Sequence, residues 1–365
     1  MKRYYYSFDT LRFVLAFFVC VMTFGVPVSF GGFIQVLSGF AAIAFYIIAG
    51  YLTVGASEHM QHVMHRAMRR AAILFAILAG AYALLNVPLY LARGEHLFFE
   101  LGSVRAWFEF AFFNTWPLRI GKTIWYVQCL LYGYVAIYLL NKLRLLRYDW
   151  IIILICMTAA ILTGELAGLI GFKVFGFTCI PATVLTRSLP YLLIGRRIRI
   201  EIEAYWTVKD PKKKEKKKKK ENEGIEETES IPKVVWIAFL LLGTVMTILE
   251  LGFLIVKGKV VYTGHFIGNG VIAIAACIMA AVKPTIGKKG VRRYGRLTAL
   301  VVYVLHHPLG YYLRLLIERS TSDWTEVINI FLAPIVFLLC AAIALPIYRI
   351  KQKNRHIESK WRVKR

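Results

Sequence analysis

The sequence predicts an all-α, polytopic membrane protein, and three observations carry that prediction. Of the 365 residues, 58% are apolar and only 18% are charged, whereas an ordinary soluble domain has about 25% charged residues. Mean hydropathy is +0.58 over the whole chain. The apolar residues also gather in long stretches that are separated by basic segments. Together these features exclude a disordered, a collagen-like or a disulfide-stapled secreted chain, and they argue against a soluble globular protein.

A membrane-spanning helix needs roughly 20 predominantly apolar residues. Ten stretches meet this requirement, at about 10–30, 33–55, 71–92, 122–141, 149–171, 178–195, 234–256, 264–282, 297–317 and 326–348. The first follows Lys2 and Arg3 as a signal peptide would, but it lacks an A-x-A-like cleavage site and more spans follow it, so we keep it as a span. The sixth is short and contains Pro181 and Pro190.

The distribution of Lys and Arg orients these spans, because cytoplasmic loops carry an excess of both. With the N-terminus inside, the inner segments hold 36 basic residues and the outer segments hold 8, while Arg187 and Arg314 lie within spans. We therefore predict about ten transmembrane helices with cytoplasmic N- and C-termini. The transmembrane domain covers residues 1–348 and is followed by a basic cytoplasmic tail, 349–365.

One cytoplasmic loop, 207–233, interrupts that domain and is predicted to be disordered. It contains the run Lys212–Lys220, broken only by Glu215, and then an acidic stretch, Glu221–Glu229. Blocks of like charge repel and stay disordered. The loop is interpreted as a solvated tether, with contact to anionic lipid headgroups as the alternative. The net charge of +25 does not predict a nucleic-acid partner, because it lies in loops and tails without a folded module.

The six cysteines all fall inside apolar stretches, and no two have the spacing of metal ligands or of a redox motif. They are interpreted as small buried hydrophobic residues, and no metal site is predicted. They are Cys20, Cys129, Cys156, Cys179, Cys277 and Cys340.

Ionisable side chains within spans are costly and mark functional candidates. Glu165 and Glu250 both fall in the outer halves of their spans, and Arg187 lies mid-span between prolines, where a broken helix exposes backbone. We expect a buried polar chamber that opens outward, with structural ion pairs as the alternative interpretation. The full set within the spans is Glu165, Arg187, Glu250, His306, His307 and Arg314, with His265 at an outer edge.

The cytoplasmic edge carries a second group of candidates. Asp9 is suited to capping the first helix or to pairing with Arg12. Arg66 and Arg69 are three residues apart and share a helix face. Together with Arg12 they could grip a phosphorylated ligand bidentately. The preceding histidines lack a carboxylate or cysteine to complete a metal site and are interpreted as part of a solvated amphipathic stretch (His59, His62 and His65).

Six segments in this order resemble the motifs of the acyltransferase-3 family of membrane-bound O-acyltransferases, across nearly all ten spans. Leu305 stands where the last motif of the family has a tryptophan. The segments are Phe8–Arg12, Ala44–Leu52, Arg66-x-x-Arg69, Ile124–Tyr126, Ser188–Gly195 and Tyr303–Pro308.

The resemblance implies a reaction and its substrates. An acyl group, taken to be acetyl, would pass from cytoplasmic acyl-coenzyme A (acetyl-CoA) to a hydroxyl of a glycan or lipid-linked glycan in the cell membrane. Arg12, Arg66 and Arg69 would bind the phosphates of this donor. No metal is implied. Arg187 would stabilise the developing oxyanion.

One departure from the family concerns the catalytic base. The family places a histidine eleven residues after the arginine, which is ~16 Å and about three turns along one helix face, but this chain has Thr23 there. Threonine cannot accept a proton near neutral pH. Three accounts stay open: His306 is a substitute base, oriented by Glu165 or Glu250; or the enzyme is slow, because general bases contribute roughly 10²–10⁴-fold; or the chain is inactive and retained for binding or assembly.

Two further interpretations complete the prediction. The outer loop 93–121, with Trp107 and Trp116, either re-enters the membrane over the acceptor side or forms an interfacial aromatic belt. The rival function is a non-catalytic carrier or flippase for a glycolipid or acylated substrate, which buried charges and a proline-broken span would also suit. A transporter of that kind favours matching internal halves, and we find no convincing pair.

Overall fold

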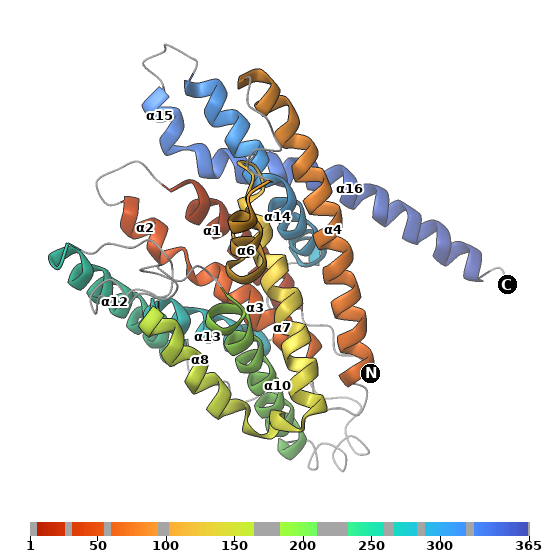
Figure 1. Cartoon of the computed structure of the whole chain (residues 1–365). Coiled ribbons are helices and arrows are strands. Elements are labelled where there is room, and N and C mark those ends of the chain that lie inside the picture. The colour runs from red at the N-terminus through yellow and green to blue at the C-terminus, as the bar shows by residue number, and fades with distance from the viewer. Residues whose placement is uncertain are drawn as a thin grey trace.

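The structure, a computed structural model, describes residues 6–25, 31–54, 60–93, 102–163, 183–209, 233–258, 266–282, 289–318 and 325–363. Every regular element in these ranges is helical, and Figure 1 shows them packed as a bundle from which the end of α16 extends toward the C-terminus. The elements are α1 (Tyr6–Phe24), α2 (Gly31–Leu37), α3 (Phe40–Thr53), α4 (Met60–Arg93), α6 (Val104–Phe113), η1 (Lys122–Ile124), α7 (Trp125–Lys142), η2 (Leu145–Tyr148), α8 (Asp149–Thr163), η3 (Val184–Ser188), α10 (Leu189–Lys209), α12 (Lys233–Val256), α13 (Ile267–Val282), α14 (Lys289–Glu318), α15 (Thr325–Ile330) and α16 (Leu332–Val363).

The chain is a multi-pass membrane protein, because its described residues form 8 helical segments long and apolar enough to cross a bilayer. These segments correspond to eight of the ten predicted spans. The predicted span 264–282 corresponds to α13, which is shorter, at 16 residues. The predicted span 178–195 lies partly outside the described residues, and its remainder forms η3 and the start of α10. The count of ten stays a prediction.

Several helices continue beyond the apolar stretches that predict them. Helix α4 begins at Met60 rather than near residue 71, α10 runs on to Lys209, and α16 carries the predicted basic tail as helix to Val363. Lys, Arg, Glu and Gln have helix propensities close to that of Leu, so a helix does not end where hydropathy falls. Of the predicted loop 207–233, residues 210–232 lie outside the described residues.

Helix α3 crosses α10 with the two backbones in direct contact. A Cβ added to Gly50 of α3 would lie 2.1 Å from Leu192 O, and one added to Gly195 of α10 would lie 2.1 Å from Ile47 O. Small residues permit such close approach between membrane helices. Two glycines from different predicted motifs therefore meet each other at one crossing.

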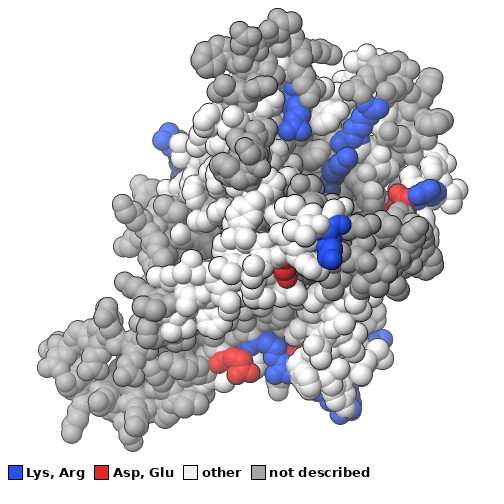
Figure 2. All heavy atoms as spheres, turned by 90° about the vertical axis from the view of Figure 1, so that its left-hand side faces the viewer, with Lys and Arg blue, Asp and Glu red and all other residues white. Residues whose placement is uncertain are grey.

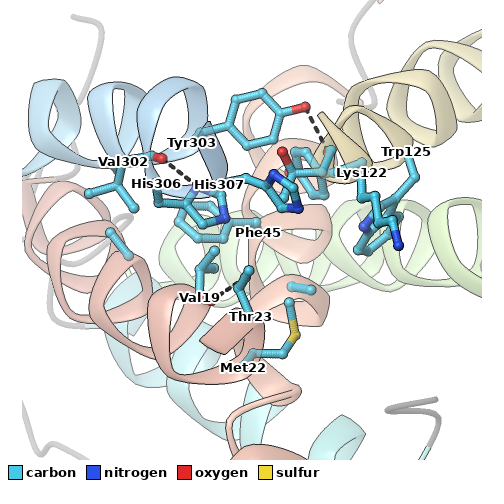
Figure 3. Close-up of a pocket in the computed structure, with 15 residues that line it drawn as sticks. Val19, Met22, Thr23, Phe45, Lys122, Trp125, Val302, Tyr303, His306 and His307 are labelled. Atoms are coloured by element: carbon cyan, nitrogen blue, oxygen red, sulfur yellow. Dashed lines mark hydrogen bonds between the residues drawn. The ribbon is translucent and has the colours of Figure 1, made fainter. Parts of the chain in front are cut away.

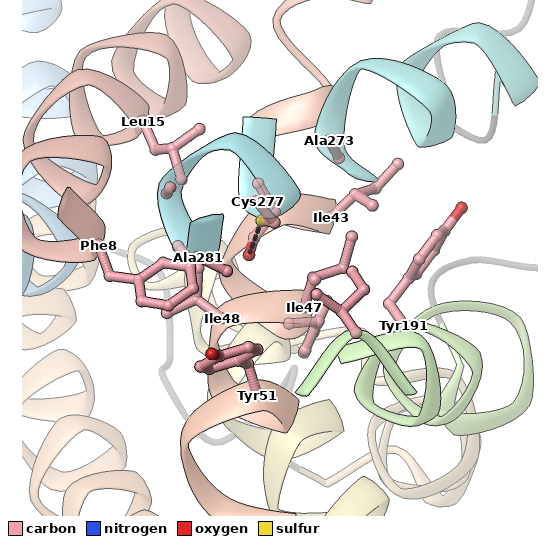
Figure 4. Close-up of a cluster of buried hydrophobic side chains, with 14 of the residues drawn as sticks. Phe8, Leu15, Ile43, Ile47, Ile48, Tyr51, Tyr191, Ala273, Cys277 and Ala281 are labelled. Atoms are coloured by element: carbon pink, nitrogen blue, oxygen red, sulfur yellow. Dashed lines mark hydrogen bonds between the residues drawn. The ribbon is translucent and has the colours of Figure 1, made fainter. Parts of the chain in front are cut away.

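The core of the bundle lies where α3 meets α1, α10 and α13 (Figure 4). Phe8 and Leu15 of α1 pack against Ile47 of α3 and Cys277 of α13, and all four side chains are buried. The Ser7 hydroxyl donates a hydrogen bond to Ala280 O of α13. These buried contacts explain why α1 begins at Tyr6, before the predicted apolar stretch.

Asp149 joins α8 to α10 through a buried ion cluster. Its carboxylate is fully buried and accepts hydrogen bonds from the guanidinium groups of Arg196 and Arg197, with Arg197 Nε at 2.7 Å from Oδ1. A buried charge needs such partners to be tolerated. The cluster fixes the start of α8 against the middle of α10.

The outer surface of the bundle is largely apolar. Figure 2 shows a face whose described surface carries few charged side chains between wide uncharged areas. Large apolar side chains stand exposed on α4 and α12, among them Ile77, Leu84, Leu241 and Leu249. Apolar surface on this scale is what lipid tails cover in a membrane protein.

Candidate functional site

A cavity of about 370 Å³ opens between α1, α3, α14 and the chain segment from Lys122 to Tyr126. Thr23 of α1 and His306 of α14 both line it, and Figure 3 shows them on facing helices with their side chains directed into the same space. Its volume is within the ~300–1,000 Å³ of small-molecule sites. The fold therefore brings together the position of the absent family histidine and its predicted substitute.

His306 presents one unpaired ring nitrogen to the interior. Its side chain is 0% exposed, and Nδ1 lies 2.5 Å from Val302 O in the preceding turn. A carbonyl only accepts hydrogen bonds, so in the neutral ring Nδ1 carries the hydrogen and Nε2 keeps its lone pair. Nε2 is buried without a hydrogen-bond partner among the described residues. A buried acceptor of this kind is ready to take a hydrogen from a ligand.

Thr23 belongs to a continuous stripe along α1. Ala16, Val19 and Thr23 all line the cavity, and together with Arg12 they follow the i, i+4, i+7, i+11 spacing of one helix face. The Thr23 hydroxyl donates to Val19 O at 2.8 Å, within its own helix. The predicted eleven-residue spacing puts Arg12 and Thr23 on one face of α1, and of the two only Thr23 is among the described residues that line the cavity.

Arg12 stands one turn before this stripe reaches the cavity. Its Nη1 lies 2.8 Å from Asp9 Oδ1, and both side chains are largely buried. The predicted pairing of Asp9 with Arg12 is confirmed. Arg12 keeps further guanidinium hydrogens that a phosphate could accept.

A turn stabilised by three hydrogen bonds positions Lys122 at the cavity. Ile120 N donates to Asn86 Oδ1 at 2.9 Å, and Ile120 O accepts from Asn86 Nδ2 at 3.0 Å and from Trp116 Nε1 at 2.8 Å. The next residue, Gly121, has a φ of 101°, and a Cβ there would lie 2.5 Å from the Tyr82 ring. Only glycine fits this turn.

His307 lines the cavity next to that turn. Gly121 N donates to His307 Nδ1 at 3.4 Å, so in the neutral ring the hydrogen is on Nε2. Its ring stacks on Tyr311 with an interplanar angle of 13°. The two adjacent histidines are therefore held in opposite tautomers, His306 as an acceptor and His307 as a donor.

Arg187 lies one aromatic ring behind the cavity wall. It is 5% exposed, and its guanidinium carbon is 5.5 Å from the centroid of the Trp125 ring. Trp125 itself lines the cavity, whereas Arg187 does not. Its charge reaches the cavity across the indole, in a cation–π contact.

Of the two predicted carboxylates, the described one, Glu250, caps a helix and has no described hydrogen bond to His306. Glu250 accepts hydrogen bonds from Ile267 N at 3.2 Å and Gly268 N at 3.3 Å, which caps the start of α13. The His306 ring is oriented by its hydrogen bond to Val302 O, a role that the sequence assigned to Glu165 or Glu250. Glu165 lies outside the described residues.

Arg66 and Arg69 are exposed on the first turns of α4. Helix α4 packs mainly on α7, whereas α1 with Arg12 packs mainly on α14. The structure places Arg66 and Arg69 on one helix, as predicted, and gives no described contact between them and Arg12. Their joint role in donor binding stays a prediction.

The rest of the cavity wall is apolar and aromatic, with Phe45, Tyr126 and Tyr303 among its largest side chains. No carboxylate is among the described residues that line it. Nor do the described parts of the chain contain a group of three His, Cys, Asp or Glu residues placed to hold a metal. The arrangement can bind a mainly apolar ligand and move one proton.

Sequence reasoning singled out His306 and His307 as ionisable residues in a span, whereas Lys122 was one of the 8 basic residues that it assigned to the outer segments. The Asn86–Ile120 contact that places Lys122 joins residues 34 positions apart. Asn86, a polar residue within the third predicted span, was the one available signal for this contact.

No family model, no curated protein and no solved structure matches this chain.

Proposed function

We propose that the protein is a membrane O-acyltransferase that moves an acyl group from acyl-coenzyme A to a hydroxyl of a glycan or lipid-linked glycan. The observation that carries the proposal is the unpartnered His306 Nε2, which faces Thr23 across a cavity large enough for an acyl group and part of an acceptor. The family resemblance of the six motifs supports the choice of donor and acceptor.

In this proposal His306 is the general base. The acceptor hydroxyl gives its proton to Nε2 as its oxygen attacks the thioester carbonyl. The tetrahedral intermediate then expels the coenzyme A thiolate, which takes the proton back from the imidazolium. Val302 O stabilises that imidazolium, because its hydrogen bond to Nδ1 strengthens as the ring becomes charged.

The other candidates support the reaction from around the cavity. His307 Nε2–H is a donor that can reach the developing oxyanion, and Arg187 adds positive potential from behind Trp125. Arg12 stands at the far end of the α1 stripe from Thr23, where the donor phosphates are proposed to bind together with Arg66 and Arg69.

Release of coenzyme A from acetyl-CoA tests the proposal, with the full chain in lipid nanodiscs and a crude glycan extract as acceptor. Wild type should release coenzyme A only when the extract is present. His306→Asn and His306→Ala should lower the rate by about 10²–10⁴-fold, the usual contribution of a general base. His306→Asn keeps a donor toward Val302 O, so its loss of activity would not report misfolding. His62→Ala, on the exposed face of α4, is the matched control.

Full turnover in the His306 variants would contradict the proposed base. A silent wild type with turnover in Thr23→His would mean that the scaffold binds both substrates but lacks a working base. A wild type that binds an acylated lipid without consuming acetyl-CoA would favour the carrier instead.

A further inference from the structure

The cavity is unbalanced in charge. Lys122 is the one charged residue among its described lining residues, and His307 beside it presents a donor. No described Asp or Glu forms an ion pair with Lys122. Lys122 is exposed, and its ammonium stands at the edge of an apolar cavity, whose low-dielectric wall strengthens its attraction for an anion bound against that wall.

The structure also fixes where this charge stands. The turn before Lys122 is tied to α4 through Asn86, and Thr123 O, directly after it, accepts from Tyr303 on α14 at 3.2 Å. The Tyr82 hydroxyl ties α4 to α14 in turn, by donating to Val304 O at 2.9 Å. The backbone of Lys122 is thus held between two helices, and its side chain is directed by a preorganised turn.

His306 and Lys122 give the cavity wall two chemically different polar groups. His306 Nε2 accepts a hydrogen, whereas Lys122 and His307 Nε2–H only donate. A ligand that satisfies both groups carries a hydroxyl for His306 and a negative group for Lys122, joined by an uncharged body against the aromatic wall. The sequence-based orientation places Lys122 on the outer side, which is the acceptor side.

We propose that Lys122 binds a carboxylate or phosphate of the acceptor, so that the substrate class is an anionic hydroxyl-bearing glycan or glycolipid. The identification of this ligand as the acceptor rests on the proposed function. Anion binding at Lys122 does not, because it requires no transfer of an acyl group.

A matched pair of probes measures the preference for an anion. The probes are ω-bromooctanoate and its uncharged methyl ester, which quench tryptophan fluorescence on contact and so report binding beside Trp125. The full chain is held in nanodiscs of zwitterionic lipid. In wild type the carboxylate should bind about tenfold more tightly than the ester, a difference of about 1.4 kcal/mol. Trp125→Phe should remove the saturable signal.

Variants of the lysine separate its charge from its shape. Lys122→Met should abolish the tenfold preference while leaving the affinity for the ester unchanged, which also shows that the cavity is intact. Lys122→Arg should keep the preference. Lys257→Met, an exposed lysine outside the cavity, should behave as wild type.

Equal binding of the two probes by wild type, or a preference that survives in Lys122→Met, would overturn the inference. It would also be overturned if phosphatidylglycerol in the nanodisc suppressed the carboxylate signal, because the anion would then be a bulk lipid headgroup. If wild type releases no coenzyme A but still prefers the carboxylate, the acyltransferase proposal fails and the anion site stands. If release depends on His306 but wild type binds both probes equally, the anion site fails and the acyltransferase proposal stands.

Discussion

At the scale of single residues, the properties of the site depend on which ring nitrogen each histidine exposes. Val302 O fixes one tautomer of His306, and Gly121 N fixes the other tautomer of His307. Neither assignment requires a carboxylate. Two neighbouring residues of the same type can therefore act as an acceptor and a donor, because different backbone groups contact them.

Asp149 offers a test of how charge is tolerated inside the bundle. Asp149→Asn removes the countercharge of Arg196 and Arg197 and leaves their guanidiniums partly buried. Breaking a buried pair costs about 3–5 kcal/mol, and we expect the lower end because the Arg197 side chain is 38% exposed. The measurement is the free energy of unfolding in mixed micelles titrated with sodium dodecyl sulfate.

Glu203→Gln is the matched control, because it neutralises an acid that pairs with Arg199 four residues away on the exposed face of α10. Surface pairs of this kind contribute only about 0.3–0.5 kcal/mol. A loss of stability in Glu203→Gln as large as that in Asp149→Asn would show that burial of the cluster is not what matters.

The sequence predicted the contacts of some site residues but not those of others. Local relations held: Asp9 pairs with Arg12, and Arg12 and Thr23 lie on one face of α1, because helical spacing alone determines them. Of the relations across the fold, the sequence anticipated that His306 would lie near Thr23 but not the partners of Glu250 and Lys122. Glu250 caps α13 instead of orienting His306, and Lys122 reaches the cavity through a turn whose partner, Asn86, is on another helix.

At the scale of elements, the apolar stretches located the helices but not their ends. Helix α12 matches its prediction to within a residue at Lys233–Val256, since its sequence is apolar from Val234 to Val256 with Glu250 as the one charged residue. Helix α10 does not match, because its second half is polar yet remains helical through Arg196, Arg199 and Glu203. Hydropathy measures transfer into lipid, whereas helix formation continues wherever propensity and packing allow.

The close crossing of α3 and α10 predicts that adding one methyl group at the crossing lowers stability, whereas adding one elsewhere does not. Gly195→Ala places a Cβ 2.1 Å from Ile47 O, so the two helices must move apart. Overpacking of this kind costs about 1–3 kcal/mol. Unfolding in mixed micelles should show that loss.

Gly80→Ala is its control, since nothing lies within 4 Å of a Cβ added at Gly80 of α4. Alanine is the better helix former by about 1 kcal/mol, so this variant should be as stable as wild type or more so. Equal stability of Gly195→Ala and Gly80→Ala would mean that α3 and α10 do not touch through their backbones.

At the scale of the whole molecule, membrane topology is the largest prediction left to test. Eight spans are supported by length and composition, and two more, 178–195 and 264–282, decide which side each later loop faces. Positive-inside counting places loop 207–233 and the C-terminus in the cytoplasm.

Reporter fusions measure this directly. Green fluorescent protein fused after Glu221 or after Arg365 should fluoresce, and alkaline phosphatase fused at those points should be inactive. Phosphatase fused after Gly258, in a predicted outer segment, should be active. An active phosphatase at Glu221 would show that 178–195 does not cross the membrane.

The positions of the cavity-lining residues in the chain also determine when the cavity forms during synthesis. Thr23 and Lys122 precede α14 in the chain, whereas His306, His307 and Tyr303 belong to α14, so the ribosome makes these two groups of wall residues at different times. Before α14 inserts, Thr123 O lacks the hydrogen bond that Tyr303 donates, and His306 is absent from the cavity wall. The cavity therefore forms only after α14 has packed against α1, and a chain that ends before α14 lacks it.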